Sequence, residues 1–167
     1  MGFDIHFFPS RGGGKPVERI SPFTGKQMIT VIKTLSSDEV TAVRKVLKGV
    51  NAHGPDSFDR YTVDLEDGGN AEVNDSDLET TGCTVVLRIL TPDLARFLYD
   101  LLKAATWVMV PVMEDHVAIA ASPESAEGIT GDYPKFVVCN SATELGALLT
   151  GGVQAWQKYR DQIVEGD

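Results

Sequence analysis

Sixteen residues of this chain, DLEDGGNAEVNDSDLE at 64–79, hold seven carboxylates and neither lysine nor arginine. Carboxylates at this density can bind a metal ion, act as a general acid and base, or dock a basic partner. They can also form a solvated hairpin, because charge at hairpin tips discourages edge-to-edge aggregation. The seven are Asp64, Glu66, Asp67, Glu72, Asp75, Asp77 and Glu79.

Metal binding is the weakest of these interpretations. An EF-hand loop needs oxygen ligands at alternate positions, then a glycine and a distal glutamate. The stretch 74–77 supplies the alternation, but the glycine and the glutamate do not follow. The three histidines and two cysteines contain no pair at the spacing of zinc ligands. We therefore expect no metal and no cofactor.

A second acidic stretch lies between Lys103 and Lys135, with five acids and no base. Within it, Glu114, Asp115 and His116 place two carboxylates beside an imidazole. Neighbouring residues of a strand point to opposite faces, so Asp115 and His116 are poorly placed to act together in catalysis. The three residues are best interpreted as a solvated turn. It joins the seven carboxylates above as a candidate partner-binding group.

Motifs for covalent or phosphate chemistry are weak. The chain has no Gly-x-Ser-x-Gly nucleophile motif. Gly12-Gly13-Gly14-Lys15 is followed by proline, where a phosphate-binding loop has serine or threonine and then a helix. Catalytic residues are not assigned, and a non-enzymatic role is favoured over an enzyme.

Charge and cysteine content narrow the classes of partner. The formal net charge is −9, although residues 1–60 alone carry nine bases and six acids. An acidic chain is repelled by nucleic acid and by anionic membranes, and it is attracted to basic proteins. Cys83 and Cys139 each lie in an apolar run, which predicts buried free thiols. With no secretory signal pattern and no membrane span, the expected location is the cytoplasm.

The elements that would position these groups follow from capping and periodicity. Ser36 with Glu39 forms a capping box, and Thr91 with Pro92 is typical of a helix start. Pro111 is expected at a strand edge or a bulge. The predicted helices are 36–49, 91–104, 141–149 and 153–163; the predicted strands are 3–8, 83–90 and 135–140, with hairpins over 17–34, 60–73 and 107–121.

The order strand, helix, strand, strand occurs twice in this prediction, as possible repeats over 28–73 and 84–121. Leu35-Ser36-Ser37-Asp38 aligns with Leu90-Thr91-Pro92-Asp93, and Glu66-Asp67 aligns with Glu114-Asp115. This element order is similar to that of bacterial effector-binding domains built from a doubled unit, without any shared residue motif. We predict a single α+β domain over 1–167, with a mostly antiparallel sheet or partial barrel and a C-terminal strand and two helices over 135–164.

The leading functional hypothesis is a bacterial cytoplasmic module that docks a basic protein through its acidic hairpins. Bacterial immunity proteins, which neutralise cationic toxins, resemble this chain in that physical respect only. A module that binds a small molecule in a groove between the two repeat helices is one alternative, and an uncharacterised enzyme is another. Neither nucleic acid nor membrane is expected as a partner.

Overall fold

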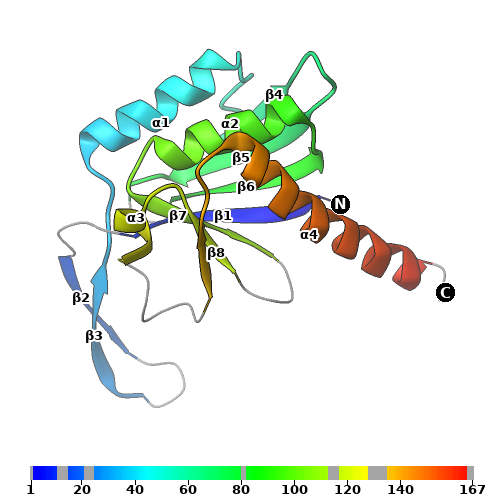
Figure 1. Cartoon of the computed structure of the whole chain (residues 1–167). Helices are drawn as coiled ribbons and strands as arrows, with labels where there is room; N and C mark the ends of the chain where they lie inside the picture. Colours follow the sequence, from blue (N-terminus) through cyan, green and yellow to red (C-terminus); the bar gives the residue numbers. More distant parts are fainter. Residues whose placement is uncertain are drawn as a thin grey trace.

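The computed structural model describes residues 2–10, 15–20, 25–79, 82–112, 117–127 and 135–164. The fold is mixed α+β, with a seven-stranded sheet, a separate two-stranded sheet and four helices (Figure 1). The elements are β1 (Phe3–Pro9), β2 (Lys15–Ile20), β3 (Gln27–Ile32), α1 (Ser37–Gly49), β4 (Arg60–Asp64), β5 (Asn70–Asp77), β6 (Gly82–Ile89), α2 (Pro92–Lys103), β7 (Trp107–Pro111), β8 (Ala118–Ala120), α3 (Pro123–Glu127), β9 (Phe136–Val138) and α4 (Ala142–Val164).

The main sheet is open and runs in the order β4-β5-β6-β1-β7-β8-β9. All neighbouring strands are antiparallel except β8 and β9. The first strand of the chain lies at the centre, where Phe7 of β1 is opposite Cys83 of β6 and Met109 of β7. The predicted fold class is confirmed as an open, mostly antiparallel sheet, with α3 and α4 near the C-terminus.

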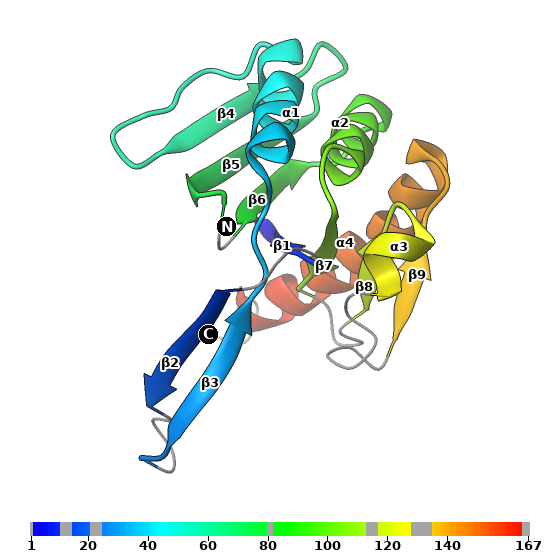
Figure 2. The ribbon, with the colours of Figure 1, turned by 90° about the vertical axis from the view of Figure 1, so that its left-hand side faces the viewer.

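Helices α1 and α2 cover one face of this sheet (Figure 2). Alternation along β1 explains the main core, because Phe3, Ile5 and Phe7 are buried while Asp4 and Phe8 on the opposite face are exposed. A smaller core lies on the opposite side of β7 and β8, where α3 contributes an alanine. Its buried members are Val108, Val110, Ala118, Ala120 and Ala126.

The predicted starts of both covering helices are confirmed. At α1 the Ser36 hydroxyl accepts a hydrogen bond from the Glu39 N–H, and the Glu39 carboxylate accepts one from the Ser36 N–H. The same carboxylate accepts a bond from the Thr106 N–H at 2.6 Å, which ties α1 to the segment before β7. At α2 the Thr91 hydroxyl accepts a bond from the Leu94 N–H.

Trp107 is the largest fully buried side chain, as expected for a core anchor. Its indole N–H donates to the carbonyl oxygens of Leu101 and Leu102, at 3.0 and 3.1 Å, in the last turn of α2. Its ring lies 5.1 Å from that of Phe7, centroid to centroid. One side chain therefore links β1, β7 and the end of α2.

Two local predictions differ from the structure. The helices expected over 141–149 and 153–163 form one continuous helix, α4, through Gly151 and Gly152. Glycine costs only about 1 kcal/mol in a helix interior, and α4 is held by packing against α2, with Leu145 and Leu149 fully buried. Pro111 ends β7 between β1 and β8 rather than at a sheet edge, and the Val112 N–H resumes the ladder to β1 by bonding the Asp4 carbonyl.

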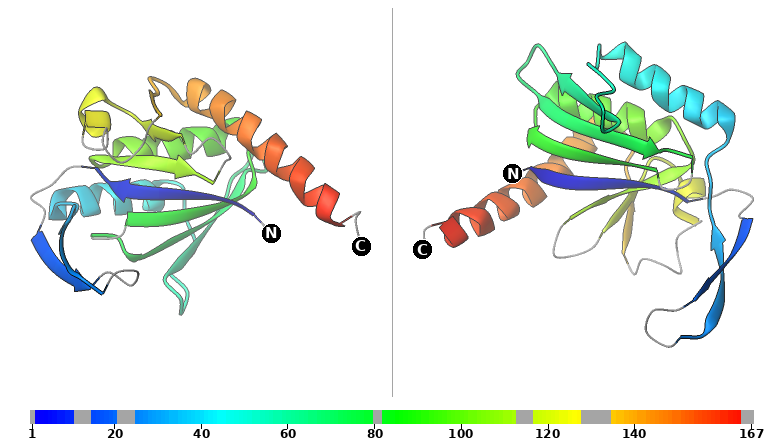
Figure 3. Two further views of the ribbon diagram at one scale, coloured as in Figure 1. Left: turned by 90° about the horizontal axis from the view of Figure 1, so that it is seen from below. Right: turned by 180° about the vertical axis from the view of Figure 1, so that it is seen from behind.

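The element order strand, helix, strand, strand is present twice along the chain, as β3-α1-β4-β5 and β6-α2-β7-β8. The two runs are placed differently, because β3 pairs only with β2 while β6 lies inside the main sheet. The β2–β3 hairpin extends away from the body and makes almost no contacts with other elements (Figures 1 and 3). Among the described helices, none is both long and apolar enough to cross a membrane.

Candidate protein-interaction surface along strand β4

The outer edge of β4 is covered by the loop over residues 51–59. His53 forms an isolated antiparallel bridge with Thr62: its N–H donates to the Thr62 carbonyl at 2.9 Å and its carbonyl accepts from the Thr62 N–H at 2.8 Å. The Asp56 N–H donates to the Arg60 carbonyl at 2.9 Å. These bonds occupy backbone groups that an unprotected edge strand would offer to another chain.

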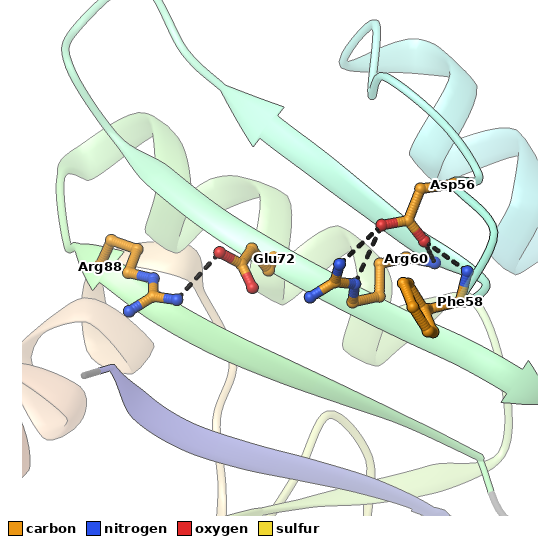
Figure 4. A network of polar contacts seen from close by, with 5 residues as sticks. All are labelled: Asp56, Phe58, Arg60, Glu72 and Arg88. Atoms are coloured by element: carbon orange, nitrogen blue, oxygen red, sulfur yellow. Dashed lines mark hydrogen bonds and ion pairs between the residues drawn. The ribbon is translucent and has the colours of Figure 1, made fainter.

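The Asp56 carboxylate organises the end of this loop. One oxygen accepts hydrogen bonds from the N–H groups of Phe58 and Arg60, at 2.8 and 3.1 Å. The other accepts from the Arg60 guanidinium, with the Nη2 atom at 2.8 Å (Figure 4). The hydrogen bond from Phe58 and the contacts with Arg60 lower the pKa of Asp56, so the carboxylate is ionised at neutral pH.

Phe58 is presented to solvent by this ordered loop. Its side chain is 69% exposed, although phenylalanine is ordinarily among the more buried residues. The Arg60 guanidinium carbon lies 5.2 Å from the ring centroid, so the ring has a cation on one side (Figure 4). The sequence analysis missed this residue; the available signal was a single aromatic within the polar stretch NAHGPDSFDR.

The acidic residues around the β4–β5 turn have different roles. Asp64 accepts a hydrogen bond from the Asn70 amide and remains exposed, and Glu66 is exposed in the turn. Asp67 instead caps α2: its carboxylate accepts bonds from the Thr91 hydroxyl at 2.8 Å and from the Asp93 N–H at 3.0 Å. Desolvation opposes ionisation of Asp67, but these bonds outweigh it and lower its pKa.

Glu72 lies further along β5 and is paired within the sheet. Its carboxylate is 2.9 Å from the Arg88 Nη2 atom on the neighbouring strand β6 (Figure 4). Both side chains are about one-third exposed, so the pair is solvent-screened. Glu72 is therefore directly paired with a base, which distinguishes it from Asp64 and Glu66 in the turn.

Asp75 is buried, with 8% of its surface exposed. Burial raises the pKa of Asp75. The positive charge of Arg44 lowers this pKa, and the negative charge of Asp59 raises it further. A carboxylate in this position is poorly placed to meet a partner. Asp77 pairs with Gly82 through the backbone ladder, and Glu79 is exposed.

The remaining predicted group, Glu114, Asp115 and His116, lies outside the described residues. The other two histidines have local roles: His53 closes the bridge to β4, and the His6 Nδ1 atom is 3.0 Å from the Thr84 hydroxyl. Gly12-Gly13-Gly14 also lies outside the described residues. Within the described part of the chain, no three His, Cys, Asp or Glu side chains are grouped as metal ligands would be.

The structure thus brings together one aromatic side chain and several acids along β4, which measures roughly 14 Å from Arg60 to Asp64 at about 3.4 Å per residue. These exposed side chains follow one another from the 51–59 loop through β4 to the β4–β5 turn. We refer to this group as the Phe58 surface: Phe58, Asp59, Arg60, Thr62, Asp64 and Glu66.

A cavity of about 420 Å³ lies elsewhere, between α2 and α4. It is lined mainly by small and threonine side chains, and Arg96 contributes the charged group. The groove expected between the repeat helices would lie between α1 and α2, so this cavity is a different place. Comparisons with family models, with characterised proteins and with solved structures return no match to this chain.

Proposed function

We propose that this protein is a binding module that docks a basic protein partner through the Phe58 surface. The observation that supports the proposal most strongly is the exposed Phe58 ring on a loop held by Asp56. Aromatic side chains dominate the free energy of many protein interfaces when they enter a pocket on the partner. A preformed loop also loses little conformational entropy on binding, which favours affinity.

The charge around Phe58 favours a basic partner. Asp59, Asp64 and Glu66 are exposed, and the whole chain has a net charge of −9. Acidic groups around an aromatic anchor attract lysine and arginine, raise the association rate and repel acidic competitors. A protein that inhibits a cationic bacterial toxin needs such an acidic surface with an aromatic anchor. By analogy, we propose that the partner is a cationic toxin and that this chain is its inhibitor.

The covered edge of β4 favours recognition through side chains over strand addition. Because His53 already bonds both backbone groups of Thr62, a partner strand could not continue the sheet at that residue. We also propose a cytoplasmic location, which is supported by Cys83 and Cys139 being free thiols.

The test begins with capture of partners from the native cell extract on the immobilised full chain at low salt. A retained protein is then purified, and its dissociation constant is measured by calorimetry. We expect a basic protein whose affinity falls about 30-fold for Phe58→Ala, the loss typical of an interface hot spot. Phe136→Ala is the matched control, because Phe136 is 44% exposed at the opposite edge of the sheet.

A charge variant completes the test. Asp64→Asn with Glu66→Gln should weaken binding and reduce its dependence on salt, because fewer screened charges remain. Asp38→Asn with Asp100→Asn removes the same charge from exposed positions on α1 and α2 and should leave binding unchanged. Wild-type affinity in both the Phe58 and the β4 charge variants, or an extract that yields no basic protein, would contradict the proposal.

Binding of a small anionic molecule between α2 and α4 is a second candidate. The cavity volume falls within the range of small-molecule sites. Arg96 lines it and has no ion-pair partner among the residues that the structure describes, although Asp93 and Asp100 lie on the same helix. A thermal-shift screen with small carboxylates and phosphates should raise the melting temperature of the wild type but not of Arg96→Gln.

A further inference from the structure

The β2–β3 hairpin is an arm that stands apart from the rest of the molecule. Its strands pair over Lys15–Ile20 and Gln27–Ile32 and make almost no contacts with any other element. A two-stranded hairpin alone is marginally stable in water, because it has too little apolar surface to bury. The arm therefore needs a surface to pack against.

The sequence of the arm indicates that this surface is partly apolar. Strand β3 reads QMITVI, with apolar residues at 28, 29, 31 and 32. Side chains alternate between the two faces of any strand, so a strand of this sequence is apolar on both faces, a sequence pattern typical of strands covered on both sides. At the end of β2, Ile20 is 72% exposed.

The arm is also basic, whereas the rest of the chain taken together is acidic. Residues 15–33 hold four bases and one acid, a net charge of +3, whereas the remaining residues have a net charge of −12. An apolar and basic arm is complementary to the Phe58 surface, which is aromatic and acidic. In Figure 1 and in the right panel of Figure 3 the arm lies at the lower end of the molecule and β4 at the upper end, so the arm does not reach the β4 of its own chain.

We propose that the Phe58 surface of one copy is occupied by the β2–β3 arm of a second copy, giving a homodimer with two exchanged arms. Reciprocal exchange is a closed, two-fold arrangement in which each copy contributes one arm and one surface. The inference rests on the proposed function, since it names the basic segment that the Phe58 surface binds when no other partner is present. A basic partner protein would then compete with the arm and dissociate the dimer.

The first experiment is sedimentation equilibrium of the full chain at low and high salt. We expect a dimer at low salt that dissociates as salt rises, because the arm and surface charges become screened. Arg19→Glu with Lys26→Glu on the arm should raise the dimer dissociation constant at least tenfold, and Phe58→Ala should raise it about 30-fold. Lys45→Glu with Lys48→Glu makes the same charge change on exposed positions of α1 and should leave the dimer intact.

Mixing two charge-reversed proteins tests the pairing directly. The arm variant Arg19→Glu with Lys26→Glu should dimerise at least tenfold more weakly than the wild type, and so should the surface variant Asp64→Lys with Glu66→Lys. Together they should form a heterodimer, because the reversed arm meets the reversed surface. Circular dichroism of each variant separates loss of association from loss of folding.

The outcomes distinguish this inference from the proposed function. A wild-type protein that is monomeric at every concentration, or a dimer unaffected by both the arm and the Phe58 variants, would overturn arm exchange. If the arm variant still binds the captured basic partner and Phe58→Ala does not, the proposed function stands without the dimer. If the arm exchanges but no basic partner binds the Phe58 surface, the dimer stands alone.

Discussion

The Asp67 carboxylate accepts a hydrogen bond from the Thr91 hydroxyl at 2.8 Å, so the turn between β4 and β5 closes the start of α2. The same carboxylate accepts from the Asp93 N–H, one of the backbone donors that a helix leaves unpaired in its first turn. An acid within the most acidic stretch of the chain is thus used to hold a helix. Two other exposed acids, Asp64 and Glu66, precede it closely along the chain.

This link predicts a non-additive effect on stability. Thr91→Ala should lower the free energy of unfolding by about 1 kcal/mol, as for other N-cap residues, and Asp67→Ala should also lower it. The double variant should lose less than the sum of the two, because each change already breaks the shared bond. Urea unfolding measures all three, with Glu66→Ala as the exposed neighbour that should leave stability unchanged. Additive losses would contradict the link.

The stabilisation that Asp67 provides should be lost in acid. The pKa of Asp67 is lowered in the folded state, so its stabilisation is present above its ordinary pKa of about 3.9 and is lost as the pH falls through the folded pKa. Asp67→Asn should therefore be less stable than the wild type at pH 7 and approach it in strong acid. Unfolding curves across this range check the sign.

For Asp75 we expect the free energy of unfolding to depend on pH in the opposite direction. Burial raises its pKa, so the ionised carboxylate destabilises the fold above the folded pKa, and the penalty disappears as the pH falls toward its ordinary value. Asp75→Asn should raise the free energy of unfolding at neutral pH, with the difference shrinking in acid. Urea unfolding at several pH values measures it, and Glu79→Gln, an exposed change on the same stretch, should show no such trend. A variant less stable than the wild type at pH 7 would mean that the ionised form is needed.

Comparing alanine substitutions at Gly82 and Gly68 separates the cost of backbone crowding from the cost of a positive φ angle. Both have positive φ, 78° and 88°, but a Cβ at Gly82 would overlap the Phe7 carbonyl oxygen whereas a Cβ at Gly68 would meet nothing. Gly68→Ala should cost about 1 kcal/mol from the φ angle alone. Gly82→Ala should cost about 3 kcal/mol or more, because the central strand β1 must move. Equal losses in thermal unfolding would show that β6 and β1 separate easily at this point.

The two thiols should be inert in the native protein. Cys83 and Cys139 are 5% and 1% exposed, and burial raises the pKa of both, with Asp75 adding to the effect at Cys83 and Glu144 at Cys139. Reaction with a thiol-specific dye should reach both cysteines only in denaturant, since the thiolate is the reactive form. Rapid labelling of either cysteine without denaturant would indicate local opening around it.

Local patterns in the sequence were sufficient for most elements. The capping box at Ser36 and the Thr91-Pro92 start predicted α1 and α2, and alternation predicted β1, because these signals depend on neighbours within one turn or one strand. The break expected at Gly151-Gly152 was wrong, since the cost of glycine is local while the packing of α4 on α2 is not. The position of Pro111 inside the sheet was missed for the same reason.

The candidate surface was predictable in its charge and not in its detail. Composition alone determined that the 64–79 stretch is acidic, that the chain is acidic overall and that the thiols lie in apolar runs. Only the tertiary structure decided which acids are engaged within the fold: Asp67 caps a helix start, Asp75 is buried and Glu72 is paired with Arg88. Charge and hydropathy belong to each residue in the sequence, whereas exposure and pairing depend on segments that meet only when the chain has folded.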